Sequence, residues 1–265
     1  SMVDRVCPAT DDSLRNAVLA DTGRNDAWPV SAEPFRQWII EGDFADDRPE
    51  FDKVGADFVD DIAPFESMKL SYLNAAHTIA STLGHLSGDT FVHESLERPE
   101  VFNFMRRALY LNVLPNAPVP KGYDGAAYIE DVIKRFQNSN LPYGNLQVGT
   151  DSSQKIQQRW FPTINLAIGN GADSSYLEFC LGAWVNFIQT ALEHDVLNDP
   201  KKDELRQAST EDLGQLALAY LKIANAEQST FFSQDNFMDS VIAHAKTIKS
   251  NGIKSALTAF LETNK

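Results

Sequence analysis

The sequence predicts a mainly α-helical protein, on three observations. Apolar residues recur at helical spacing along most of the chain, strand signals are scarce, and no repeat of fixed period is present. A length of 265 residues is enough for one domain with a sizeable core. Because no obvious linker divides the chain, we expect a single helical domain over residues 1–265.

The first elements are indicated by caps and prolines. Residues 11–21, "DDSLRNAVLAD", begin with capping side chains and predict a helix. Residues 33–44 read as a short helix with Pro34 at its first position. Residues 48–66 hold two prolines and a short apolar alternation, Ala56 to Phe58, which predicts a loop with one brief strand.

A long helix is expected to open at Pro64 and to close at Gly88. After Lys69 it contains no Asp, Glu, Lys or Arg for nineteen residues, which predicts burial on most sides. Further helices are expected at 98–114, 124–138, 152–169, 174–195, 211–226, 234–250 and 252–262.

The composition argues against several classes of partner. A net charge of −14 and a pI near 4.7 disfavour binding to nucleic acid and to anionic membrane surfaces. Residues 70–88 approach membrane-spanning length but are too polar to span lipid. The two cysteines, Cys7 and Cys180, predict free thiols in a reducing compartment, and we expect a cytoplasmic protein with no secretory signal.

The long helix carries a polar stripe. At about 100° per residue, Asn74 lies about 140° and His77 about 80° from Lys69. The small residues Ser81 and Gly84 continue this flank. A groove of small residues beside three hydrogen-bonding groups leaves space for a ligand.

These side chains match a known kind of chemistry. Apolar surroundings would lower the pKa of Lys69, so that its amine could exchange a proton with an alcohol. Asn74 and His77 could then donate hydrogen bonds to the oxygen on which negative charge develops. This set suits the interconversion of a carbonyl and an alcohol. The structural alternative is a solvated lysine at a helix start and an ordinary core histidine.

Two other signals do not predict a site. His77, His85 and His93 recur every eight residues, but this spacing rotates a helix by about 80°, and Gly88 is expected to end the helix, so we predict no metal. The stretch "GNGADS" (169–174) lacks the third glycine of a dinucleotide fingerprint and lies between two helical patterns. We interpret it as a turn between helices.

The order Lys69-x4-Asn74-x2-His77 resembles the catalytic signature of the long-chain polyol-specific dehydrogenases. Residues 2–10 look like that family's Val-Asp-Arg segment at a domain junction, and residues 151–159, "DSSQKIQQR", look like its Asp-Gly-Ser-x-Lys-x-Pro-x-Arg segment. The resemblance covers at least residues 2–190. Ser152 and Gln157 depart from the family pattern, which has Gly and Pro at these positions.

The resemblance implies a multi-helical C-terminal substrate and catalytic domain, 6-phosphogluconate-dehydrogenase-like in fold. It implies Lys69 as the general acid–base, Asn74 and His77 as groups on the substrate oxygen, and Lys155 and Arg159 as substrate contacts. The cofactor would be NAD or NADP without a metal, and the substrate a sugar acid (fructuronate or mannonate first) or a polyol (mannitol or fructose second).

Residues 1–10 would form the domain junction, and the N-terminal Rossmann domain would be missing from this chain. We therefore expect that domain as a partner, and no turnover by the chain alone. The alternative function is a non-catalytic α-helical binding or interaction module that retains the family fold.

Overall fold

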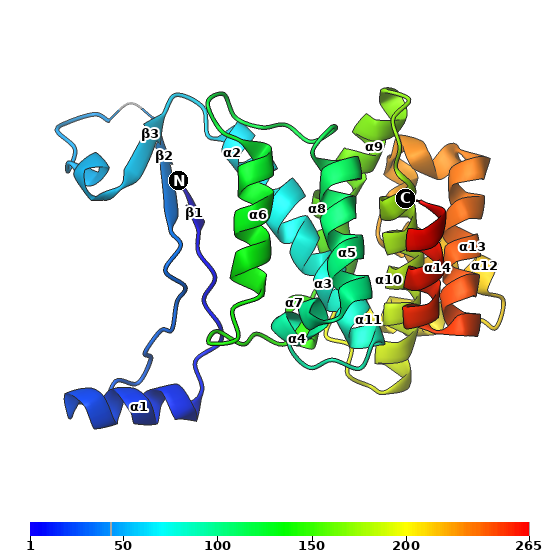
Figure 1. Ribbon diagram of the computed structural model, residues 1–265, viewed down its shortest axis with the longest axis horizontal. Helices are drawn as coiled ribbons and strands as arrows, with labels where there is room; N and C mark the ends of the chain where they lie inside the picture. Colours follow the sequence, from blue (N-terminus) through cyan, green and yellow to red (C-terminus); the bar gives the residue numbers. More distant parts are fainter. Residues whose placement is uncertain (43, 265) are drawn as a thin grey trace.

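The computed structural model describes residues 1–42 and 44–264 as a small sheet attached to a larger helical body (Figure 1). The strands are β1 (Met2–Asp4), β2 (Gln37–Glu41) and β3 (Ala56–Val59). The helices up to the middle of the chain are α1 (Asp12–Thr22), α2 (Ala63–Met68), α3 (Ala75–Leu86), α4 (Val92–Glu97), α5 (Pro99–Ala108), α6 (Gly125–Phe136) and α7 (Asn145–Val148). Those that follow are α8 (Ser152–Arg159), α9 (Phe161–Gly169), α10 (Ser175–Glu193), α11 (Lys202–Gln207), α12 (Leu213–Ile223), α13 (Asp235–Asn251) and α14 (Ile253–Thr263).

The sheet is mixed, in the order β1-β2-β3. Strand β2 pairs antiparallel with β1 and parallel with β3, so that Ile39 lies opposite both Met2 and Asp57. Ile39 is fully buried and forms a small apolar cluster with Met2 and Phe65. This cluster packs the sheet onto the start of the long helix.

The sheet corrects two predictions. The helix expected over 33–44 is wrong, because its centre is β2; Asp43 lies outside the described residues. Trp38, Ile39 and Ile40 are aromatic and β-branched side chains that suit a pleated surface, and pairing on both edges outweighs the helical spacing. The predicted fold class, a mainly α-helical domain, is therefore wrong for the first sixty residues, although the brief strand expected at Ala56–Phe58 is confirmed.

The other helix predictions hold with shifted ends, except the one over 152–169. The helix over 11–21 is confirmed as α1: Asp11 caps its first turn, and Gly23 ends it in a left-handed conformation. The helix over 152–169 is instead two helices, α8 and α9, which meet at Trp160. Pro162 cannot donate the backbone hydrogen bond that would continue α8. Three short helices, α4, α7 and α11, were not expected.

The core of the helical body surrounds α10. This helix buries large side chains on most of its faces, and Trp184 is fully buried. It packs against α13 and α3, and Figure 1 shows α10, α13 and α14 side by side at the end of the molecule away from the sheet. At the other end, α6 lies on the side of the body nearest the sheet.

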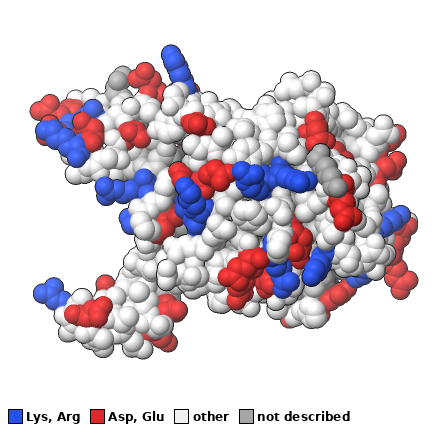
Figure 2. Space-filling view, in the orientation of Figure 1, with Lys and Arg blue, Asp and Glu red and all other residues white. Residues whose placement is uncertain are grey.

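The surface agrees with the composition. On the face in Figure 2, acidic and basic side chains are interspersed. Helix α1 buries none of its residues and projects from the molecule. Both cysteines are free thiols, as expected; Cys7 is exposed, and burial raises the pKa of Cys180. In the described part of the chain, no helix has both the length and the apolar character needed to cross a membrane.

Gly182 tests the close contact between α10 and α13. A Cβ atom there would lie 2.8 Å from the backbone nitrogen of Ala245 and 2.9 Å from the carbonyl oxygen of Val241. We expect Gly182→Ala to lower the free energy of unfolding by about 1–3 kcal/mol, because neither backbone atom can move away easily. Urea unfolding measures this change.

The matched control is Gly169→Ala, at the end of α9, where a Cβ would have no neighbour within 4 Å. This variant should be neutral or gain about 0.5 kcal/mol. Equal stability of the two variants would contradict the close contact.

Candidate active site

The helix that carries the predicted site changes its winding at that site. Between α2 and α3, residues Lys69–Asn74 form a π-helical turn, and the whole segment from Ala63 to Leu86 runs on as one helix. A π-turn pairs residues five apart and is frequent at functional sites. Lys69 begins this turn and Asn74 ends it, so they lie about one turn apart. The helical wheel, which separates them by about 140°, does not apply here.

Lys69 joins the long helix to the sheet. Its Nζ donates a hydrogen bond of 2.8 Å to the carbonyl oxygen of Val3 on β1. The Lys69 side chain is half-buried at this junction. The predicted acid–base therefore lies where the sheet meets the helical body.

His77 lies in an aromatic cage one turn further along. Its ring stacks on Phe136 of α6, with ring centroids 4.0 Å apart and planes within 10°, and meets Tyr143 edge-on at 5.3 Å. The Nε2 atom is buried and has no hydrogen-bond partner among the described residues. A buried polar atom without a partner costs free energy, so this nitrogen is a candidate for binding a ligand oxygen.

The surroundings of His77 are strongly cationic. Desolvation first, and then the charges of Arg159, Arg135, Lys155 and Lys69, place the pKa of His77 well below its usual value. The imidazole is therefore neutral at neutral pH, with one nitrogen as donor and the other as acceptor. Positive potential at this point contrasts with the net charge of −14.

Arg159 approaches the end of the π-turn. It donates to the hydroxyl of Thr78 at 2.7 Å and to the carbonyl oxygen of Asn74 at 3.2 Å. Next to it, Trp160 donates from Nε1 to the carbonyl oxygen of Ala75. Both acceptors of Arg159 are neutral, and desolvation lowers its pKa to about 10. A half-buried guanidinium that has no carboxylate partner among residues 1–42 and 44–264 favours a bound anion.

Lys155 lies four residues before Arg159 on α8. Its Nζ donates to the carbonyl oxygen of Val148 at 3.4 Å, and desolvation, followed by the charge of Arg159, lowers its pKa. Ser152, where the family pattern has Gly, does not occupy a position that requires glycine. The left-handed residue is Asp151, with φ of 55°, and Ser152 already belongs to the helix.

The structure thus gathers the five predicted residues around one helix segment. Lys69 and Asn74 bound the π-turn, His77 follows it, and Arg159 bonds to Asn74, while Lys155 and Arg159 both influence His77 electrostatically. The individual roles of these residues stay predictions. Sequence reasoning missed the aromatic cage of His77, because Phe136 and Tyr143 are more than fifty residues away along the chain.

The three histidines expected not to form a metal site contact different aromatic rings: His77 stacks on Phe136 and His93 on Phe91, whereas His85 meets Phe187 edge-on. No group of three or more His, Cys, Asp or Glu suited to a metal ion occurs among residues 1–42 and 44–264.

Two family models match the chain. The model for the mannitol dehydrogenase C-terminal domain matches residues 61–248, and the model for the mannitol dehydrogenase Rossmann domain matches residues 1–53. The fold and the site therefore define a class of dehydrogenases in which a Rossmann-type sheet adjoins a helical domain. The chain belongs to the mannitol dehydrogenase family, which confirms the resemblance to polyol-specific dehydrogenases.

Known relatives agree with this assignment. The chain is 30% identical to D-mannonate oxidoreductase of Escherichia coli over 264 residues, and 30% identical to mannitol 2-dehydrogenase of Aspergillus niger over 268 residues. These alignments cover 98% and 99% of the chain, and 54% and 55% of the relatives. The chain thus spans about half the length of the curated relatives it matches.

Two solved structures share the fold. The ternary complex of Pseudomonas fluorescens mannitol 2-dehydrogenase with NAD and D-mannitol superimposes with a TM-score of 0.87 at 30% identity, over 98% of this chain and 54% of that one. A substrate-free D-sorbitol dehydrogenase gives 0.83 at 27% identity, over 97% and 53%.

The Rossmann match corrects the predicted domain content. A lone helical C-terminal domain without any Rossmann region is wrong, because residues 1–53 match the Rossmann model and form most of the sheet. A separate Rossmann domain as partner, and inactivity for want of one, are not supported. The prediction rested on residues 2–10 as a domain junction and on the missing glycine fingerprint, and the helix predicted over 33–44 concealed strand β2.

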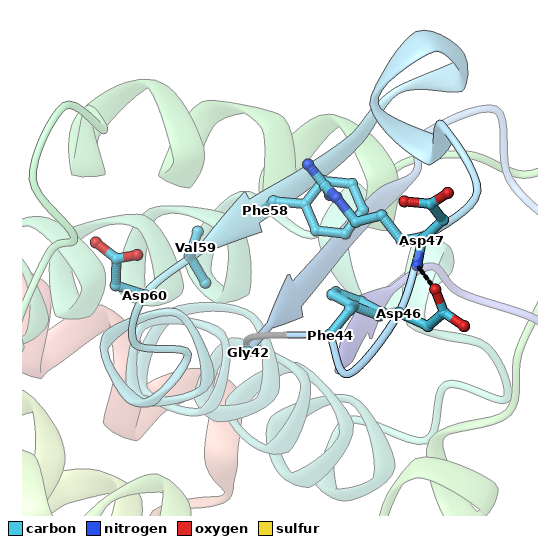
Figure 3. A pocket seen from close by; sticks show the side chains of 8 residues that line it. Gly42, Phe44, Asp46, Asp47, Phe58, Val59 and Asp60 are labelled. Carbon is cyan, nitrogen blue, oxygen red and sulfur yellow. Dashed lines mark hydrogen bonds between the residues drawn. The ribbon is translucent and has the colours of Figure 1, made fainter.

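A dinucleotide such as NAD fits part of this site. The hydrogen-bonding groups at the π-turn, with the unpartnered Nε2 of His77, suit the reacting end of the cofactor and an alcohol. Its phosphates fit poorly in the hollow at the carboxyl ends of β2 and β3 (Figure 3), because the three carboxylates of Asp46, Asp47 and Asp60 outnumber the one cation in its lining, Arg48. Gly169 and Gly171 lie at the C-terminal end of α9, as expected for a turn between helices.

The pKa shift of His77 makes folding pH-dependent. Because its pKa is lowered in the folded state, the unfolded chain binds more protons below about pH 6.5. The free energy of unfolding should therefore fall as pH falls below that value. In His77→Gln, this fall should be smaller by up to about 1.4 kcal/mol per pH unit, measured by urea unfolding between pH 7.5 and 5.

The matched control is His194→Gln, which removes an exposed imidazole. His85 and His244 also have lowered pKa values and contribute to the pH dependence of the wild type. The contribution of His77 is therefore the difference in pH slope between the wild type and His77→Gln. Equal pH slopes for wild type and His77→Gln would contradict the burial of a neutral His77.

Proposed function

We propose that this chain carries the catalytic site of an NAD-dependent oxidoreductase that interconverts a secondary alcohol and a ketone in a sugar acid or a polyol. The observation that carries the proposal is the π-turn bounded by Lys69 and Asn74, beside a His77 whose Nε2 is buried without a partner. His85 on the same helix also has a buried Nε2 without a partner, so this feature alone does not distinguish the two functions. The combination of the π-turn with the cationic surroundings of His77 is what speaks against the non-catalytic module. The similar structure of Pseudomonas fluorescens mannitol 2-dehydrogenase is a complex with NAD, which supports NAD as the cofactor.

Proton transfer falls to Lys69 in this proposal. In the direction of alcohol oxidation, its neutral amine accepts the proton of the substrate hydroxyl; in ketone reduction, its ammonium returns a proton to the oxygen. The cofactor supplies the hydride acceptor when bound. The carboxamide of Asn74 and the neutral imidazole of His77 donate hydrogen bonds to the substrate oxygen, where negative charge develops.

The surrounding charge favours a sugar acid over a neutral polyol. Arg159 has only neutral acceptors among the described residues, and Lys155 lies close enough to Arg159 for their charges to interact. A substrate carboxylate would offset both charges in a poorly solvated place. We therefore propose that the substrates are the ketone and alcohol pair fructuronate and mannonate. The second choice is the pair fructose and mannitol.

Lys69→Ala tests the proposed acid–base. Its kcat should fall by about 10²–10⁴-fold at every pH, because no other group takes over the proton, while NAD binding stays nearly unchanged. Steady-state assays and calorimetric NAD titration on the complete natural protein measure the two effects. The matched control is Lys134→Ala, an exposed lysine on α6 that should keep wild-type activity. Retained turnover in Lys69→Ala would remove this amine from the mechanism.

Lys155→Met tests the preference for an anion. We expect the KM for mannonate to rise by about tenfold or more and the KM for mannitol to change less, since only mannonate carries a charge that Lys155 can pair with. A panel of hexonates, hexuronates and hexitols measures both. Equal losses on charged and neutral substrates would contradict a carboxylate beside Lys155.

A further inference from the structure

Two adjacent residues at the end of α6 face different parts of the molecule. Arg135 reaches the N-terminal segment that contains the sheet, where it bonds Asp4 of β1 and Glu33. Phe136 turns the other way and stacks on His77 at 4.0 Å. One helix end therefore contacts both the sheet and a proposed catalytic side chain.

The Arg135 cluster is almost completely buried. The side chains of Arg135, Asp4 and Glu33 are 6%, 0% and 3% exposed. Arg135 makes two hydrogen bonds to each carboxylate, at 2.7 and 3.1 Å to Asp4 and at 2.7 and 2.9 Å to Glu33. Desolvation opposes the charge of Arg135, but its hydrogen bonds with both carboxylates raise its pKa.

Further bonds fix the two carboxylates. The Tyr128 hydroxyl, also on α6, donates to Asp4 at 2.5 Å, and the backbone nitrogen of Val6 donates to Glu33 at 2.5 Å. Phe35 covers the guanidinium at 4.1 Å. The cluster therefore has one well-defined geometry, with Asp4 held against α6.

Strand β1 connects the Arg135 cluster to Lys69. Asp4 directly follows Val3, whose carbonyl oxygen accepts the hydrogen bond of Lys69. A continuous set of contacts thus runs from Lys69 through Val3 and Asp4 to Arg135, and from Phe136 to His77. Lys69 and His77 share one helix, so a shift of β1 relative to α6 would act on their side chains and change the position of the Lys69 amine relative to the His77 ring.

We propose that Arg135 is a positioning residue, which sets the position of the Lys69 amine relative to the His77 ring by fastening β1 to the end of α6. The inference rests on the proposed function of these two residues. Arginine is required because its planar fork bonds both carboxylates at once, whereas lysine offers a single point charge. Reacting groups misplaced by about 1 Å can lose about 10²-fold in rate, so the cluster acts on turnover without touching substrate.

The test compares Arg135→Lys with Arg98→Lys in the complete natural protein. Arg98 also bonds a carboxylate with two nitrogens, Asp89 at 2.7 to 2.9 Å, but at the far end of α3. At a temperature where both variants are folded, we expect Arg135→Lys to lose about tenfold or more in kcat with a KM change below about threefold. Arg98→Lys should keep its kcat within about twofold.

Glu33→Gln is the second variant, in case Arg135→Lys does not fold. It weakens one arm of the cluster and leaves Asp4 in place, so it should lower kcat in the same direction by a smaller factor. Unchanged kcat in the folded Arg135 and Glu33 variants, or an equal loss in Arg98→Lys, would overturn the proposal.

A second readout separates this proposal from the proposed function. The imidazole signals of His77, assigned by their loss in His77→Gln, should shift in Arg135→Lys and stay in place in Arg98→Lys. If wild type shows no NAD-dependent turnover of sugar acids or polyols, the proposed function fails, while this measurement still reports on positioning. An unshifted His77 signal in Arg135→Lys overturns the positioning role.

Discussion

The π-turn from Lys69 to Asn74 is the constraint on which the site depends. An α-helix would rotate these two residues apart, and the wider turn returns them to one side of the helix. Side chains donate hydrogen bonds to carbonyl oxygens at the end of this turn: Arg159 and Thr78 to that of Asn74, and Trp160 to that of Ala75. Helix α8 and Trp160, which follows it, thus contact the end of the turn that runs from the proposed acid–base to Asn74.

Charge is distributed unevenly in this protein. The net charge is −14, yet Arg159, Arg135, Lys155 and Lys69 all act on His77. Arg135 is neutralised by two carboxylates, whereas Arg159 has neutral acceptors. Arg135 therefore serves to fasten the structure, whereas Arg159 is available to bind an anion. Burial and the surrounding positive charges keep the imidazole of His77 neutral. A neutral imidazole is suited to hydrogen bonding rather than to carrying charge.

The junction between sheet and helical body combines two kinds of interaction. Met2, Ile39 and Phe65 form a small apolar cluster, and Arg135 with its two carboxylates forms a buried ionic one. Apolar contacts tolerate small displacements, whereas bidentate ion pairs have one preferred geometry. A buried ionic cluster adds little net stability, since desolvation offsets much of the attraction. Its role here is to hold β1 in one position relative to α6.

The sequence by itself determined most of the helices and the identity of the candidate site. Helical spacing and caps are local properties, so α1, α6 and α10 could be expected from it, and Lys69, Asn74 and His77 lie close together in the chain. Tertiary structure decided the rest. Strand β2 forms only because β1 and β3 pair with it, the π-turn leaves no residue pattern that we could read, and Phe136, Arg135 and Asp4 meet across distances in sequence that only folding closes.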